Sequence, residues 1–143
     1  MPLKNRTSQG KNTFDKISRI LAENGAKKVM FDYSNDGKME AISFAIEIEG
    51  QLSGFKLPAM VENVTEIMFG GEDRHGNKKK VTDAQREQAY KTAWANVRDW
   101  IDAQVAMITT KQVKIEQVFL PYMVMKDGNT LYENMKNQNL LLK

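Results

Sequence analysis

The spacing of apolar residues changes along the first half of the chain, and each change predicts a new element. Four apolar residues repeat at helical spacing: Phe14, Ile17, Ile20 and Leu21. Asn12 or Thr13 can cap the start of this helix, and Asn24 with Gly25 can end it. The sequence therefore predicts a first helix from about residue 13 to residue 24.

Alternation with a period of two follows and predicts a sheet. In residues 42–48 apolar side chains alternate with small or acidic ones, which is typical of a strand with one buried and one polar face. Residues 29–33 alternate in the same way before a turn at residues 34–37, and residues 53–57 form a short third strand. Pro58 would then open a second helix. The apolar face of that helix would consist of Met60, Val61, Val64, Ile67 and Met68.

A long amphipathic helix is predicted for residues 83–109. Thr82 and Gln85 have the spacing of a capping box. Six apolar residues then keep the helical period: Tyr90, Trp94, Val97, Ile101, Val105 and Ile108. At about 1.5 Å per residue the helix would be roughly 40 Å long, so it either crosses the whole body or packs partly on a second chain. Short helices are expected near residues 115–121 and 131–135, and Thr130 with Glu133 has the capping-box spacing that would open the second of them.

Together these elements predict a single α+β domain over residues 13–143. Its order would be helix, three-stranded antiparallel sheet, helix, long helix and C-terminal helical cap. Residues 70–80 contain three glycines and no aliphatic side chain, so they would form an exposed loop and a soft seam within the domain. Residues 1–12 show no apolar repeat and would be a flexible basic tail.

The composition excludes several classes of protein. The chain has no cysteine, so disulfides, zinc thiolates and thiol nucleophiles are excluded, which fits a reducing cytoplasm. No run of about 18 apolar residues occurs, and the polar start of the chain does not resemble a secretory signal. We therefore expect a cytoplasmic protein without a membrane partner. The net charge of +3 permits nucleic-acid binding without requiring it.

No combination of residues suggests catalysis. The single histidine, His75, lies in the glycine-rich loop, where no rigid scaffold would hold it as a general base. Asp32, Asp36 and Glu40 surround one turn, but their order does not match a calcium-binding loop. Both glycine-rich phosphate-binding motifs are missing as well. We therefore expect no catalytic residue, no metal site and no cofactor.

The basic loop and the start of the long helix are the strongest candidates for a binding site. Lysines that precede a helix N-terminus can hold phosphate together with the backbone N–H groups. The candidate phosphate-binding residues are Arg74, Lys78, Lys79, Lys80, Arg86, Lys91 and Arg98. A solvated charge run without a ligand, or a surface for an acidic protein, would give the same pattern.

Trp100 and the apolar end of the chain suggest a different function. Trp94 belongs to the apolar stripe and is expected in the core, whereas Trp100 is offset from it. Arg98 and Asp102 have the spacing of a surface ion pair beside Trp100. Trp100 and residues Leu140, Leu141 and Leu142 would form an interface with a second copy or with a host protein.

Several segments resemble a group of small proteins encoded by bacteriophages and prophages. They are 93-AWANVRDWIDAQ-104, 118-VFLPYM-123 and 130-TLYE-133, with GAKKVMFDY and AISFAIEIEG earlier in the chain. The resemblance covers roughly residues 14–135. It implies a phage origin and action in the cytoplasm of a bacterial host, and it implies no activity or functional residue.

Two functions follow as hypotheses. The first is a non-enzymatic phage accessory protein that contacts nucleic-acid phosphates, with single-stranded DNA as the favoured ligand, in replication or recombination. The alternative is a protein-interaction module, such as an inhibitor or host-takeover factor, that acts through the long helix and the C-terminal tail.

Overall fold

The computed structural model describes residues 2–139, and for residues 2–11 it describes the backbone only. The elements are, in order, α1 (Pro2–Glu23), β1 (Ala26–Tyr33), β2 (Met39–Ile48), β3 (Gln51–Pro58), α2 (Val61–Phe69), α3 (Asp83–Thr109), α4 (Ile115–Phe119), the 3-10 turn η1 (Leu120–Tyr122) and α5 (Leu131–Asn137). This order confirms the predicted α+β fold, including the long helix at residues 83–109.

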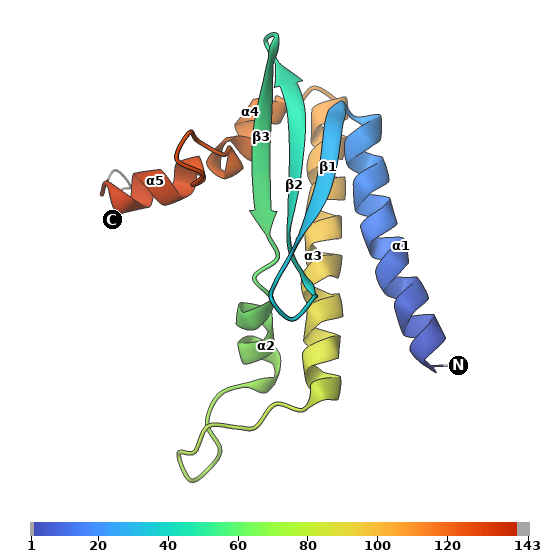
Figure 1. Cartoon of the computed structure of the whole chain (residues 1–143), viewed down its shortest axis with the longest axis vertical. Coiled ribbons are helices and arrows are strands. Elements are labelled where there is room, and N and C mark those ends of the chain that lie inside the picture. The colour runs from blue at the N-terminus through green and yellow to red at the C-terminus, as the bar shows by residue number, and fades with distance from the viewer. Residues whose placement is uncertain (1, 140–143) are drawn as a thin grey trace.

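The three strands form an antiparallel sheet with β2 in the middle. Phe44 on β2 lies opposite Val29 of β1 and Phe55 of β3, so one face of the sheet collects large apolar side chains. Helices α1 and α3 lie behind this face, and no helix among the described elements covers the opposite face (Figure 1). The alternation predicted for residues 42–48 is thus the alternation between a covered and an open face.

Two groups of aromatic rings fill the space between the sheet and the helices. Trp94 of α3 is 1% exposed, and its ring lies 5.1 Å from Phe14 and 5.8 Å from Phe31. At the other end, Phe44 stacks on Phe55 at 5.4 Å, and Phe119 lies edge-on to Phe44 at 5.2 Å. The prediction that Trp94 belongs to the core is confirmed.

Helix α1 begins much earlier than predicted. It starts at Pro2 and runs without interruption to Glu23, so the prediction that residues 2–12 lie outside the first helix is wrong. Periodicity could not reveal this extension, because residues 2–12 carry no apolar stripe. Once the second half of α1 is packed, each further residue adds a hydrogen bond without a new nucleation cost. Proline is also well suited to the first position of a helix.

The second helix begins later than predicted. Pro58 ends strand β3 opposite Ala41, and α2 starts only at Val61, so the assignment of Pro58 to the helix is wrong. A proline has no N–H to donate, which the end of an outer strand tolerates. Met60, with a left-handed φ of 53°, turns the chain from the strand into the helix.

The C-terminal segment is attached to the edge of β3. The N–H of Val124 donates to the carbonyl of Gly54 at 2.8 Å, and the N–H of Leu131 donates to the carbonyl of Met123 at 2.8 Å. The capping boxes that open α3 at Thr82 and α5 at Thr130 are both present. The predicted C-terminal helical cap is therefore confirmed, and hydrogen bonds join it to the sheet.

Candidate nucleic-acid interface

Residues 71–80 contain a small hairpin between α2 and α3. Glu72 and Lys78 pair as a single antiparallel bridge, and the N–H of Lys79 donates to the carbonyl of Gly71 at 2.9 Å. The N–H of Asp73 donates to the carbonyl of Asn77 at 2.7 Å and closes the turn. The predicted loop thus has a defined backbone conformation, which we call the basic hairpin.

The side chain of Asp73 holds the tip of the basic hairpin. One carboxylate oxygen, Oδ1, accepts hydrogen bonds from the N–H groups of His75 at 2.8 Å and Asn77 at 3.0 Å. Gly76 adopts the left-handed φ of 80° that the turn requires. His75 therefore takes part in the turn through its backbone, while its side chain lies in solvent.

The basic hairpin presents four predicted cations to solvent: Arg74, Lys78, Lys79 and Lys80. None of the four side chains forms an ion pair with another residue in the described range 2–139. The hairpin projects beyond the end of α2, away from the sheet (Figure 1). Two carboxylates, Glu72 and Asp73, lie on the same hairpin and reduce its net charge.

The N-terminus of α3 is already capped. Oγ1 of Thr82 accepts from the N–H of Gln85 at 3.1 Å, and Oε1 of Gln85 accepts from the N–H of Thr82 at 3.0 Å. Two of the backbone donors that could have held a phosphate are therefore occupied. Phosphate contact at this place would depend on the lysine side chains, and Lys80 lies only two residues before the cap.

Arg86 lies apart from the basic hairpin cations. Its Nη1 atom is 3.8 Å from a carboxylate oxygen of Glu62 on α2, and both side chains are largely exposed. Arg86 lines a cavity of about 690 Å³ between the β1–β2 turn, α2 and α3. Glu40 and Lys56 line the same cavity, so its charges are mixed rather than basic.

Lys91 and Arg98 lie together on another side of α3, in a cavity of about 390 Å³ between α1 and α3. Lys16 of α1 lines the same cavity. Sequence reasoning missed Lys16, because nothing in the sequence shows that α1 packs beside this part of α3. The Nη2 atom of Arg98 lies 3.1 Å from Asp99, so the predicted pairing of Arg98 with Asp102 is wrong.

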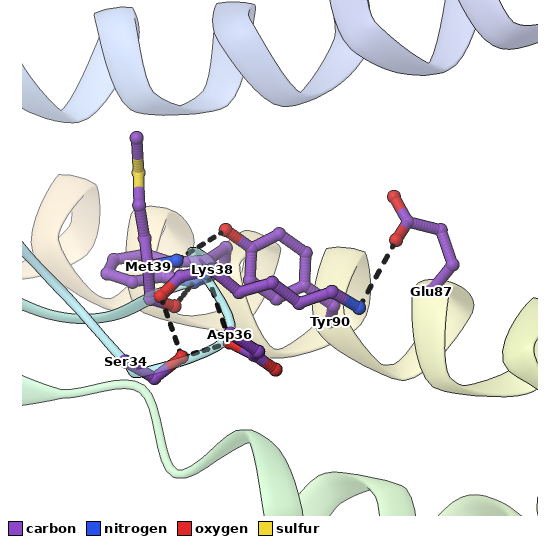
Figure 2. A network of polar contacts seen from close by, with 7 residues as sticks. Ser34, Asp36, Lys38, Met39, Glu87 and Tyr90 are labelled. Atoms are coloured by element: carbon purple, nitrogen blue, oxygen red, sulfur yellow. Dashed lines mark hydrogen bonds and ion pairs between the residues drawn. The ribbon is translucent and has the colours of Figure 1, made fainter.

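A polar network ties the β1–β2 turn to α3 (Figure 2), and Tyr90 in this network lines both cavities. The hydroxyl of Tyr90 accepts from the N–H of Met39 at 3.0 Å, and Nε1 of Trp94 donates to the carbonyl of Met39 at 3.0 Å. Lys38 lies over the Tyr90 ring and is 3.6 Å from a carboxylate oxygen of Glu87. Burial raises the pKa of Tyr90 above its usual value, so its hydroxyl keeps its proton to a higher pH than an exposed tyrosine does.

The acidic residues around this turn have structural roles. Asp36 accepts hydrogen bonds from the hydroxyl of Ser34 and from the N–H of Lys38. Both hydrogen bonds lower the pKa of Asp36, and the one from Ser34 has the larger effect. Asp32 accepts from the hydroxyl of Ser43 at 2.8 Å on the open face of the sheet. Within residues 2–139, no three potential metal ligands of the His, Cys, Asp or Glu type come together.

Trp100 contacts its own chain. Its ring lies edge-on to Phe119 at 5.7 Å and to Tyr122 at 5.9 Å, so it packs on the C-terminal segment and is half-buried. Leu140, Leu141 and Leu142 lie outside the described residues. On α3 the exposed large apolar side chain is Met107, so the described part of this helix offers little apolar surface to a partner.

Helix α2 exposes apolar side chains that were predicted to be covered. Ile67 is 87% exposed, and Met60 and Met68 are exposed as well. The residue that α2 buries most deeply is Thr65, whose hydroxyl donates to the carbonyl of Val61 at 2.8 Å. The predicted apolar face is therefore wrong at Met60, Ile67 and Met68, because α2 turns its Thr65 side inward instead.

Comparisons with known proteins do not identify this chain: no protein family, curated protein or solved structure matches it. Across residues 2–139, no helix has both the length and the hydrophobicity that crossing a membrane requires.

Proposed function

We propose that this protein binds nucleic acid through phosphate contacts made by the basic hairpin. The observation that carries the proposal is the placement of Arg74, Lys78, Lys79 and Lys80 on one projecting turn, exposed and without ion-pair partners in the described chain. An unpaired surface cation loses little when it replaces its counterions with a phosphate. Release of those counterions favours binding and makes it depend on salt.

The proposed contact positions the nucleic acid without reading its sequence. Base recognition uses side chains that reach base edges or stack on bases. The basic hairpin carries no aromatic side chain besides His75, and its lysines act as point charges. We therefore propose binding with little sequence preference. Single-stranded DNA is the ligand that we propose to test first.

The biological setting is a further part of the proposal. The resemblance of residues 93–104 and 118–123 to phage-encoded proteins supports a phage origin and action in the bacterial cytoplasm. An accessory role in phage replication or recombination is the setting that we propose for phosphate binding there. No enzymatic step is part of this role. A basic hairpin on a folded body suits a protein that adheres to a strand while other proteins act on it.

Fluorescence anisotropy tests the proposal with labelled single-stranded DNA, double-stranded DNA and RNA at about 50 mM and about 200 mM salt. Each phosphate contact lowers log K by about 0.9 per unit of log salt on duplex DNA and by about 0.7 on single strands. The variant Lys78→Gln, Lys79→Gln, Lys80→Gln should therefore weaken binding about tenfold to a hundredfold and reduce the salt slope by about two to three.

A matched control removes the same charge elsewhere. Lys28, Lys126 and Lys136 are also exposed lysines, and their replacement by glutamine should change affinity and salt slope much less than the hairpin variant does. Equal losses of affinity in the hairpin variant and in the control variant would show that binding depends on the net charge of the protein and not on the position of the lysines. Absence of binding by the wild-type protein at about 50 mM salt would end the nucleic-acid proposal.

A further inference from the structure

The cavity between α1 and α3 combines a basic rim with aromatic rings. Its volume is about 390 Å³, which lies at the small end of the range of roughly 300–1,000 Å³ for ligand sites. Three cations, Lys16, Lys91 and Arg98, line the cavity together with three aromatic side chains, Phe14, Tyr90 and Trp94. Phe14 and Lys16 lie more than 50 residues before the basic hairpin, and the other four residues follow its last lysine by 10 to 18 residues.

The positive charge of this cavity is not neutralised from within. Lys16 and Lys91 form no ion pair with a residue in the described range, and Arg98 binds Asp99, which does not line the cavity. The lining carboxylate is Glu87, which the ammonium group of Lys38 approaches to 3.6 Å from the neighbouring turn. Cations held close together in a partly enclosed space attract an anion more strongly than the same cations on an open surface.

The aromatic rings add an apolar surface for a flat group. Phe14 and Tyr90 are half-buried, and their ring centroids lie 6.4 Å apart. Trp94 lies beneath Phe14, edge-on at 5.1 Å, and holds that ring in place. Aromatic side chains that keep part of their surface exposed can stack on a base.

We propose that this cavity binds a nucleoside monophosphate, with the phosphate held by Lys16, Lys91 and Arg98 and the base placed against Phe14 and Tyr90. The group can come from a free nucleotide or from the terminal phosphate of a strand. The proposal goes beyond the basic hairpin, because this cavity would bind a nucleotide even if the hairpin bound nothing.

Isothermal titration calorimetry with adenosine monophosphate, adenosine and inorganic phosphate tests the proposal on the full chain at about 50 mM salt. Adenosine monophosphate should bind at least about tenfold more tightly than adenosine or phosphate, because only it uses both the cations and the rings. Lys16→Gln and Lys91→Gln should each weaken its binding at least about fivefold, whereas Lys91→Arg keeps the charge and should retain most of the affinity. A thermal melt of each variant confirms that it is folded.

The triple hairpin variant separates this site from the proposed function. It should bind adenosine monophosphate as the wild type does, while its affinity for strands falls. In that variant, a preference for 5′-phosphorylated over 5′-hydroxyl oligonucleotides would assign the site to strand ends, and equal binding would assign it to free nucleotides. The proposal is overturned if adenosine monophosphate does not bind at about 1 mM, if phosphate alone binds as tightly, or if Lys16→Gln and Lys91→Gln match the wild type.

Discussion

Two turns of this chain are built in the same way and differ in what lies behind them. In each, an aspartate carboxylate accepts a backbone N–H two residues further on: Asp36 from Lys38, and Asp73 from His75. The first turn lies against α3, where Tyr90 accepts a hydrogen bond from the N–H of Met39 and Trp94 donates one to the carbonyl of Met39. The basic hairpin that contains Asp73 has no comparable contact with the body in the described chain.

The difference shows how one local motif can be tied to the core in one place and lie free in solvent in another. Behind the first turn, the buried ring of Trp94 and the long-range hydrogen bonds to Met39 tie the turn to the core. Beyond the second, solvent surrounds four cations that no neighbour neutralises. Changes at the first turn should therefore affect unfolding, and changes at the second should affect binding.

The largest effect is expected at Trp94. Trp94→Ala removes a fully buried ring and the hydrogen bond to Met39, so it should lower the free energy of unfolding by about 3–5 kcal/mol. Urea unfolding followed by circular dichroism measures this loss. Trp100→Ala is the control, and its half-buried ring should cost less. A loss below about 1 kcal/mol at Trp94 would contradict the anchoring of the first turn.

A smaller effect is expected at Tyr90. Tyr90→Phe deprives the Met39 N–H of its acceptor and should cost about 1 kcal/mol at neutral pH. Because burial raises the pKa of Tyr90, the folded protein keeps this proton at a pH where the unfolded chain loses it, above about 10. The wild type should therefore lose its advantage over the variant as the pH rises through that range. Urea unfolding at pH 7, 9 and 10.5 should show it, and a constant difference would argue against a buried hydroxyl.

The basic hairpin should show the reverse pattern. Asp73→Ala removes the acceptor that shapes the tip, yet it should change the free energy of unfolding by less than about 0.5 kcal/mol. The affinity of the Asp73→Ala protein for single-stranded DNA should fall severalfold, because the tip would no longer hold the cations in their present arrangement. Asp73→Asn keeps an oxygen acceptor and should retain binding. A destabilisation above about 1 kcal/mol would mean that this turn, too, supports the body.

The smallest effect is expected at Asp36, and it is present at neutral pH and lost in acid. The hydrogen bonds from Ser34 and Lys38 lower the pKa of Asp36, so its carboxylate stabilises the fold above its ordinary pKa and this contribution is lost as the pH falls through the lowered value. The stability difference between wild type and Asp36→Asn should therefore disappear in acid. Asn35→Ser in the same turn should give a difference that does not vary with pH, as thermal melts from pH 7 to pH 2 would show.

Local patterns predicted most of the fold. Alternation in residues 42–48 identified the central strand, and the capping residues at Thr82 and Thr130 identified the starts of α3 and α5. These features depend on hydrogen bonds and side-chain directions within a few residues, so their spacing is visible in the sequence. The start of α1 at Pro2 was missed, because a polar extension of a helix has no periodicity to detect.

The candidate sites also divide into features that are visible in the sequence and features that only the packing of the helices creates. The sequence by itself determined that Arg74 and residues 78–80 share one exposed segment, because they are neighbours in a glycine-rich stretch that cannot be buried. Only the tertiary structure decided that Lys16 joins Lys91 and Arg98 around one cavity, that Arg86 faces Glu62 instead, and that Trp100 packs on its own chain. The physical reason is that these contacts join residues on different helices, and the way in which helices pack is decided by the shape of the whole core.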